Sequence, residues 1–299
     1  MNMHFRCGYI AILGRPNVGK STLLNHLIGQ KLSITSRKPQ TTRHQILGIK
    51  TTDDAQFVFV DTPGIHKGGK QALHRYLNRA ARSIVQDMDL IVFVVEARRW
   101  EEQDDIVLSY IKEAKCPVML VINKIDLIKD KDELLPYLEQ VGGKHSFVGV
   151  VPVSANKNLQ LDTLLDLIKQ KLPESEAHYP PDQLTTRSSN FVAAEMIREK
   201  LVRLLGDELP YATTVEIEKF EDTKKLLRLH AIIWVERDNQ KSIVIGKKGE
   251  KIKKIGVQAR KDLQNFFEKK VHLETWVKVR KGWADDERAL QQLGYIDEF

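Results

Sequence analysis

One stretch decides the fold of this chain: GRPNVGKS, the residues Gly14–Ser21. It lies between the apolar run Tyr9–Leu13 and an amphipathic stretch with helical character. A glycine-rich turn in that position, ending in Gly-Lys-Ser, is typical of a phosphate-binding loop. Its backbone N–H groups converge on phosphate oxygens, and the following helix presents its positive end there. We predict that Lys20 contacts the β- and γ-phosphates of a nucleotide and that Ser21 binds Mg²⁺. The nucleotide contacts predicted in this region are Gly14, Arg15, Pro16, Asn17, Val18, Gly19, Lys20, Ser21 and Thr22.

Short apolar runs alternate with longer amphipathic stretches up to about Leu172. Continuous apolar runs of this length predict strands of a buried, mostly parallel sheet, and the stretches between them predict crossover helices on both of its faces. The expected fold class of this first part is therefore an α/β domain. The predicted strands are Tyr9–Leu13, Phe57–Val60, Leu90–Val95, Val118–Ile122 and Val148–Val153, with Gln45–Thr51 as a candidate edge strand.

The segment Asn123-Lys124-Ile125-Asp126 follows a predicted strand and indicates which base is bound. A carboxylate at Asp126 can accept hydrogen bonds from N1–H and the exocyclic amine of guanine. Adenine has no such pair of donors, so the site favours GTP and GDP over ATP. We expect the Lys124 stem to cover the base and Asn123 to brace the loops. The predicted base-side contacts are Asn123, Lys124, Ile125, Asp126, Ser154 and Ala155.

A second set of polar residues is placed to respond to the γ-phosphate. Asp61, which follows the Phe57–Val60 strand, is predicted to hold Mg²⁺ through water, and the Gly64 N–H is predicted to sense the γ-phosphate. Thr42 is the expected Mg²⁺-binding switch threonine, and Thr41 is the alternative. The predicted metal ligands are Ser21, Thr42 and Asp61, and the further nucleotide contacts are Thr62, Pro63, Gly64 and Ile65.

With five such segments in order, the domain resembles the translation-factor-related GTPases, the class that includes Ras. Ras-like enzymes orient the attacking water with a glutamine where this chain has Ile65. Catalysis must then rest on positioning and on Mg²⁺, and the resemblance makes Asn17 a candidate ligand of a charge-neutralising K⁺. The residues expected to serve catalysis are Asn17, Lys20, Thr42, Asp61 and Gly64. The other loop cations and histidines (Arg15, Arg37, Arg43, His44, His66 and His74) are interpreted as solvated loop residues more readily than as catalytic groups.

Three prolines interrupt the pattern between Pro173 and Ser189, which predicts a first domain over 1–173, a linker over 174–189 and a second domain over 190–299. The elements expected in the second domain follow the order α-β-β-α-α-β. Its part from Lys241 to Lys281 holds 13 Lys/Arg and 4 Asp/Glu, although the whole chain carries only +7. Such a cationic segment indicates a polyanionic partner.

The turn Gly246-Lys247-Lys248-Gly249 lies between two of the expected helices. Glycines there allow a nucleic-acid strand to approach the backbone, and lysines attract its phosphates. The element order resembles an α+β type II KH domain, which implies single-stranded RNA binding with bases beside Ile243–Ile245. The predicted RNA contacts are Ile243, Ile245, Gly246, Lys247, Lys248, Gly249, Lys251, Lys253, Lys254 and Arg260. Trp276 is expected to be packed or partly exposed, and Trp283 to pack on the sheet with RNA contact as an option.

Taken together, the two modules resemble the bacterial Era family over essentially the whole chain, including the segment Gly282–Arg288. The resemblance implies a cytoplasmic monomer with a peripheral inner-membrane fraction. It also implies GTP/GDP and Mg²⁺ as cofactors, K⁺ as a candidate third, and the 3′ end of small-subunit ribosomal RNA and the 30S subunit as partners. Two alternatives stay open: a GTPase that serves RNA modification, and an RNA-binding module whose nucleotide is never hydrolysed.

Two simple features of the composition agree with a cytoplasmic protein. The longest purely apolar run, Leu90–Val95, has six residues, whereas a membrane-spanning helix needs about 20. The two cysteines, Cys7 and Cys116, predict neither a disulfide framework nor a zinc site. A reducing compartment is therefore expected.

Overall fold

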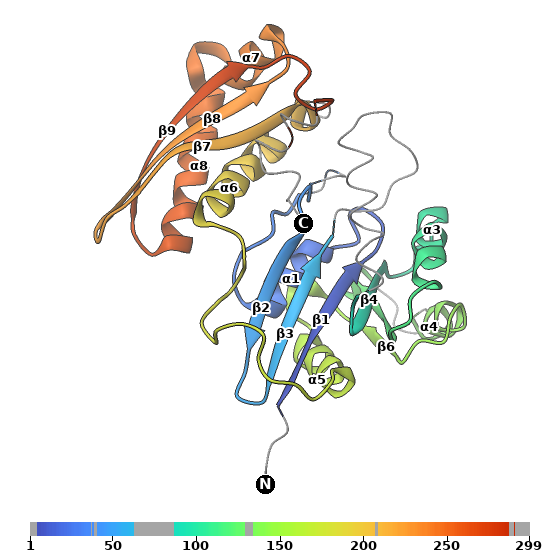
Figure 1. Ribbon diagram of the computed structural model, residues 1–299. Coiled ribbons are helices and arrows are strands. Elements are labelled where there is room, and N and C mark those ends of the chain that lie inside the picture. Colours follow the sequence, from blue (N-terminus) through green and yellow to red (C-terminus); the bar gives the residue numbers. More distant parts are fainter. Residues whose placement is uncertain are drawn as a thin grey trace. The chain divides into compact units, whose positions relative to one another are not determined.

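The computed structural model describes residues 5–36, 38, 41–62, 87–128, 134–206, 209–286 and 290. The chain forms two compact units, and the described residues of each are given by number. The first unit holds 5–33, 42–62, 87–128 and 134–186. The second holds 34–36, 38, 41, 187–206, 209–286 and 290. The two units are shown in Figure 1 and described separately below.

The first unit is built on a six-stranded sheet with the strand order β2-β3-β1-β4-β5-β6. The candidate edge strand is present as β2, at one edge of the sheet. It is antiparallel to β3, whereas all other neighbouring strands are parallel. Every residue of β3 is buried, because a strand inside a three-layer domain is covered on both faces. The strands are β1 (Arg6–Leu13), β2 (Ile46–Thr51), β3 (Ala55–Asp61), β4 (Leu90–Glu96), β5 (Val118–Asn123) and β6 (Gly149–Pro152).

Helices connect these strands and cover the sheet (Figure 1). The buried apolar residues of α3 and α4 pack with Phe93 and Leu120 in one cluster. On another part of the sheet, α1 packs so closely on Gly48 of β2 that a Cβ there would overlap the Ile28 side chain. The helices are α1 (Lys20–Ile28), α3 (Glu102–Ile111), α4 (Leu134–Gly142) and α5 (Leu161–Lys171), with short 3₁₀ turns η2 (Ile125–Leu127) and η4 (Ala155–Lys157).

The proline-rich stretch after α5 packs along the first unit as far as Thr186. The buried side chain of Gln56 accepts hydrogen bonds from the backbone N–H groups of His178 and Tyr179, at 2.8 and 3.0 Å, and donates to the Tyr179 carbonyl at 2.8 Å. Ile49 N donates to the Leu184 carbonyl at 2.8 Å. The division between the two units therefore falls after Thr186, inside the range predicted as a linker.

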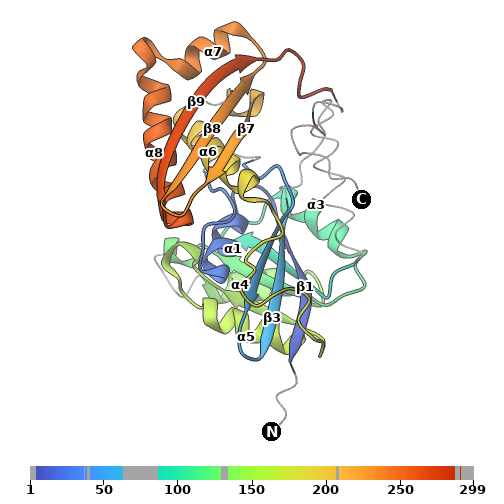
Figure 2. The same cartoon turned by 60° about the vertical axis from the view of Figure 1, so that its left-hand side comes forward.

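The second unit has the predicted order α-β-β-α-α-β (Figure 2). Its sheet has the order β7-β8-β9, in which β8 is antiparallel to β7 and parallel to β9. Alternate residues of β8 point to the helices and are fully buried, including Leu229 and Ile233. The elements are α6 (Ser189–Leu204), η5 (Leu209–Ala212), β7 (Thr213–Asp222), β8 (Leu226–Val235), α7 (Asp238–Ile245), η6 (Lys247–Gly249), α8 (Glu250–Phe267) and β9 (Lys270–Val279).

A short piece of chain from the N-terminal half also belongs to the second unit. It is the 34–41 segment, defined here by its described residues Ile34, Thr35, Ser36, Lys38 and Thr41. The residues on either side of it, Ser33 and Thr42, belong to the first unit. The chain therefore leaves the first unit between α1 and β2 and returns to it eight residues later.

Candidate nucleotide and RNA sites

The phosphate-binding loop follows β1, and its last two residues, Lys20 and Ser21, begin α1. Gly19 has φ +102°, and a Cβ there would overlap the side-chain amide of Asn123, so only glycine fits. The Lys20 ammonium donates to the carbonyls of Gly14 and Arg15 at 2.8 and 2.9 Å. Burial lowers the pKa of Lys20 to about 8, and the carboxylate of Asp61 partly opposes that effect. Lys20 is thus a buried cation held within the loop, where a phosphate would restore its charge balance.

The three predicted metal ligands lie together beside this loop. Ser21 Oγ is 2.9 Å from Thr42 Oγ1 and 2.9 Å from Asp61 Oδ2. Ser33 Oγ donates to the same Asp61 oxygen at 2.8 Å. Ser33 was not predicted, because a lone serine in a loop has no pattern that distinguishes it.

Asp61 has a second oxygen that tests whether a cation fits. The residue is fully buried, and its Oδ1 has no hydrogen-bond partner among the described residues. Burial raises the pKa of the Asp61 carboxyl, while Lys20 and the Ser33 and Ser21 hydroxyls lower it. A buried carboxylate oxygen without a donor is costly unless a cation or water satisfies it. Two hydroxyls and a carboxylate are the oxygen ligands that Mg²⁺ prefers, so the residues present fit this ion.

The predicted base-recognition loops meet through Asn123. Its side chain donates to the Val18 carbonyl of the phosphate-binding loop at 2.8 Å and accepts from the Ala155 N–H at 3.0 Å. Asp126 is exposed, and one of its oxygens accepts a short hydrogen bond from Ser154 Oγ. The structure therefore brings the phosphate loop, the Asn123–Asp126 segment and the Ser154–Ala155 turn together in one unit.

The side chain of Arg15 is buried in ion pairs, so its interpretation as a solvated loop cation is wrong. Its guanidinium is buried against Asp104 at 3.1 Å and Glu101 at 3.6 Å, at the start of α3, and against Glu96 at 3.2 Å, at the end of β4. A guanidinium with three acidic partners satisfies its charge there. Only the Arg15 main chain remains available to line the loop. The acidic cluster was missed, because its members lie far apart from Arg15 in sequence.

The remaining predicted residues of the N-terminal half have different environments. Arg43 and His44 are 2% and 4% exposed, so their interpretation as solvated loop residues is wrong. Asn17 is exposed in the left-handed conformation, with φ 64°, and Thr62 is buried with its hydroxyl donating to the Ile12 carbonyl. Pro16, Thr22 and Ile125 are half-buried. The predictions on Arg37, Pro63, Gly64, Ile65, His66 and His74 lie outside the described residues.

In the second unit, the Gly246–Gly249 turn joins α7 to α8. Gly246 has φ +74°, and a Cβ there would lie 2.7 Å from the Lys251 Cβ, so the turn requires glycine. Lys247 and Lys248 are exposed, as are Lys253, Lys254 and Arg260 along α8. Ile243 is 43% exposed on α7, whereas Val244 beside it is buried. Ile245 and Lys251 are half-buried. The turn thus presents a close-approach backbone, two cations and an apolar side chain.

The two tryptophans have different environments. Trp283 is fully buried, so the option that it contacts RNA is wrong, and its prediction as a packing residue is correct. Its indole N–H donates to the Ala212 carbonyl at 3.4 Å, as is usual for a buried tryptophan. Trp276 is 41% exposed on β9, with its ring 5.3 Å from that of His230.

Comparison with known proteins identifies both domains. A family model described as a 50S ribosome-binding GTPase matches residues 9–124, and one described as a KH domain matches residues 208–284. The protein called GTPase Era from Ectopseudomonas mendocina is 57% identical over 98% of this chain and 98% of its own length. The chain belongs to the Era family of GTPases. The Era protein of Yersinia enterocolitica is 53% identical over 98% of this chain and 97% of its own.

Two solved Era structures share the whole fold. One is an Aquifex aeolicus Era variant bound to GDP·AlF₄⁻, with a TM-score of 0.93, 38% identity and coverage of 97% of this chain and 99% of its own. The other is Era in complex with MgGDPNP and nucleotides 1506–1542 of 16S ribosomal RNA, with a TM-score of 0.93, 39% identity and coverage of 98% and 99%. The predicted Era-type GTPase, with an α/β domain followed by a KH domain, is thereby confirmed.

Proposed function

We propose that this Era-family protein is a GTP-hydrolysing switch that binds the 3′ end of small-subunit ribosomal RNA and assists 30S assembly and rRNA maturation. The observation that carries the proposal is the presence, in one chain, of an assembled guanine-nucleotide site and an exposed Gly-Lys-Lys-Gly turn. The related Era complex with MgGDPNP and 16S ribosomal RNA supports both ligands.

The chemistry assigned to the first unit rests on positioning and charge. Lys20, protonated at pH 7, faces the phosphates, and Ser21, Thr42 and Asp61 would hold Mg²⁺. Bound there, Mg²⁺ would neutralise charge that develops on the phosphoryl group. The exposed Asn17 is the proposed ligand for K⁺ in the same role. The Asn123–Asp126 segment supplies selection of guanine.

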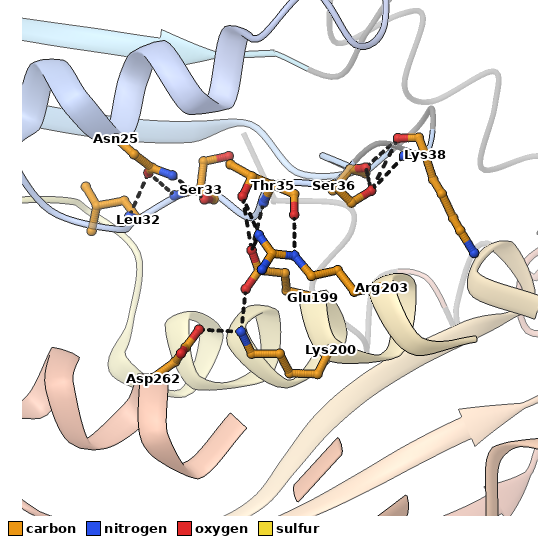
Figure 3. A network of polar contacts seen from close by, with 11 residues as sticks. Asn25, Leu32, Ser33, Thr35, Ser36, Lys38, Glu199, Lys200, Arg203 and Asp262 are labelled. Carbon is orange, nitrogen blue, oxygen red and sulfur yellow. Dashed lines mark hydrogen bonds and ion pairs between the residues drawn. The ribbon is translucent and has the colours of Figure 1, made fainter. Parts of the chain in front are cut away.

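A connection between nucleotide and RNA is provided by the 34–41 segment, which binds α6 inside the second unit (Figure 3). Glu199 accepts from the Thr35 N–H and hydroxyl at 3.1 and 3.2 Å. Arg203 donates to the Thr35 carbonyl and hydroxyl at 2.9 and 2.8 Å, and it pairs with Glu199 at 2.8 Å. All the polar atoms of Thr35 are therefore bonded to two adjacent turns of one helix.

The other end of the segment is held as well. Arg198 donates to the Thr41 carbonyl at 2.5 Å while pairing with Glu195. The Lys38 ammonium donates to the carbonyls of Leu205 and Gly206 at the end of α6, where a cation is favoured by the helix dipole. The segment is thus fixed to α6 at three points. One of them, Thr41, immediately precedes the predicted Mg²⁺ ligand Thr42.

The same network continues from α6 to α8. Lys200 donates to Glu199 at 3.0 Å and to Asp262, which lies on α8. The helix α8 begins directly after the Gly246–Gly249 turn. A chain of contacts therefore runs from Thr35 through Glu199 and Lys200 to the helix that carries the predicted RNA contacts.

We infer that GTP and RNA both favour the state in which the 34–41 segment is bound to α6. In this structure the segment is bound to α6 while Thr42 Oγ1 lies 2.9 Å from Ser21 Oγ, so the two arrangements are compatible. A ligand that orders Thr42 would restrain Thr41 and thereby favour binding of the segment to α6. Because coupling of binding equilibria is reciprocal, RNA would then raise the affinity for GTP. Hydrolysis of GTP would remove this bias and release the RNA.

Phosphate release measured with and without ribosomal RNA tests the proposed function. Stimulation by RNA that contains the small-subunit 3′ end supports an RNA-regulated GTPase. A nucleotide that stays unhydrolysed in every condition would show that the protein is a binding module instead. Crosslinking of peptides around Lys247 and Lys248 to cellular RNA, with and without GTP, identifies the target. Recovery of random transcripts, or of a modified RNA class unrelated to the 30S subunit, would contradict the assembly role.

The remaining properties are proposed from the resemblance to the Era family. We place the protein in the cytoplasm as a monomer, with a weakly bound peripheral fraction at the inner membrane. None of the described helices is long and apolar enough to cross a bilayer. Fractionation with a salt wash checks the membrane fraction, and sedimentation at several concentrations checks the monomer. A fraction that only detergent releases would contradict peripheral binding.

A further inference from the structure

Two cations of the nucleotide site share one carboxylate at the end of β4. Glu96 Oε2 accepts from Lys124 Nζ at 2.9 Å and from the Arg15 guanidinium at 3.2 Å. Lys124 belongs to the base-recognition segment and Arg15 to the phosphate-binding loop. Glu96 therefore joins the two loops that hold opposite ends of a nucleotide.

The position of Glu96 is fixed by its main chain. Its carbonyl accepts from the Tyr137 hydroxyl at 2.9 Å, and the next residue, Ala97, donates its N–H to the Asn123 carbonyl at 2.9 Å. The Glu96 side chain is 20% exposed, so its ion pairs are only partly screened by water. A carboxylate anchored in this way can hold flexible partners in place.

Lys124 is the partner that most needs such restraint. It has a left-handed backbone with φ 67°, and its side chain has four rotatable bonds and 29% exposure. A lysine stem that must lie along the face of a base loses rotamer freedom on binding. Its ion pair with Glu96 removes part of that freedom in advance, because the ammonium is already held beside the site. Arg15 differs, since Asp104 and Glu101 hold it independently of Glu96.

We propose that Glu96 is a positioning residue for guanine-nucleotide binding, which pre-orients Lys124 along the base and ties the base-recognition segment to the phosphate-binding loop. The inference rests on the proposed GTP site. GDP and GTP carry the same base, so Glu96 acts on both nucleotides equally. It touches no reacting atom, so it affects binding and leaves the hydrolytic step unchanged.

The test measures nucleotide affinity and turnover in the full chain with Glu96→Gln, which keeps the size of the side chain and removes its charge. We expect the Kd values for GDP and for a GTP analogue to rise together by about tenfold, and KM to rise with kcat unchanged. Glu101→Gln is the matched control. Glu101 also pairs with Arg15, and its other ion-pair partner among the described residues is Arg99 rather than Lys124. Its substitution should therefore leave both affinities near wild type.

A double-mutant cycle distinguishes positioning of Lys124 from a general structural effect. In a Lys124→Met background, Glu96→Gln should weaken binding by less than twofold, because the residue that it orients is absent. An equal loss in both backgrounds would overturn the proposal, as would a fall in kcat at unchanged Kd or no change in affinity. If the wild-type chain itself fails to bind GTP, the proposed function fails first, and the two failures are thereby distinguished.

Discussion

The binding of the 34–41 segment to α6 makes one prediction that tests the proposed coupling directly. Thr35→Val removes the hydroxyl that donates to Glu199 at 3.2 Å and accepts from Arg203 at 2.8 Å, while it keeps the β-branched shape. Thr35→Ser keeps the hydroxyl and loses only a methyl group. The pair of variants thus separates these two hydrogen bonds from the packing of the side chain.

The expected magnitude follows from the bonds that remain. Hydrogen bonds to charged groups contribute about 1.5–3 kcal/mol each. Glu199 and Arg203 still pair with each other at 2.8 Å after the substitution, and both retain bonds to the Thr35 main chain. The free energy of binding of the 34–41 segment to α6 should therefore weaken by an amount at the low end of this range, about 1.5 kcal/mol. That corresponds to roughly a tenfold change in the equilibrium between the bound and the released segment.

The assay is the affinity for RNA carrying the small-subunit 3′ end, measured by fluorescence anisotropy with GDP and with a non-hydrolysable GTP analogue. In the wild-type protein the analogue should strengthen RNA binding. In Thr35→Val the ratio of the RNA affinity with the analogue to that with GDP should fall toward one, by up to about tenfold. Thr35→Ser should keep most of the wild-type ratio. A wild-type ratio in Thr35→Val would refute the route through Glu199, even if both ligands bind normally.

Three further predictions concern charge. Because the pKa of Lys20 is lowered to about 8, its side chain is mostly charged below that pH and mostly neutral above it. A bound phosphate favours the charged form, so GTP binding at pH 8.5 should take up about three quarters of a proton, and at pH 7 almost none. Calorimetry in buffers of different ionisation enthalpy measures this, and equal uptake at both pH values would contradict the buried-lysine argument. Replacing Lys247 and Lys248 by alanine should weaken RNA binding and reduce the slope of log K against log salt by about 1.4, while the rate of GTP turnover stays unchanged. An unchanged slope would mean that these lysines do not contact the RNA phosphates. Finally, K⁺ should support faster turnover than Na⁺ or Cs⁺, and Asn17→Ala should abolish the difference. Equal rates with all three ions would exclude the K⁺ role.

Some of these features were accessible from local sequence. The strand–loop–helix at Gly14–Ser21 and the element order around Gly246–Gly249 depend on short-range patterns, such as apolar runs, helical periodicity and glycines needed at positive φ. Backbone geometry of this kind is imposed by neighbouring residues. The fold class, the family and the list of segments that would surround a nucleotide therefore followed without coordinates.

The partners of the charged side chains could not be predicted from the sequence, and the reason is geometric. Arg15 lies 81 residues from Glu96 and 89 from Asp104, and nothing in its own segment shows that it turns toward them. Thr35 is 164 residues from Glu199, and no short pattern links a loop threonine to a helix so distant in the sequence. A long charged side chain can reach solvent, phosphate or a carboxylate from the same backbone position, and only the packed chain selects among them.

The sequence by itself thus determined that this chain binds a guanine nucleotide and carries a KH domain, because both depend on local backbone motifs with little freedom. Only the tertiary structure decided that Arg15 and Lys124 share Glu96 and that the 34–41 segment binds α6. These contacts depend on which distant side chains the fold brings within hydrogen-bond distance, and burial then makes each pairing necessary because an unpaired buried charge is costly.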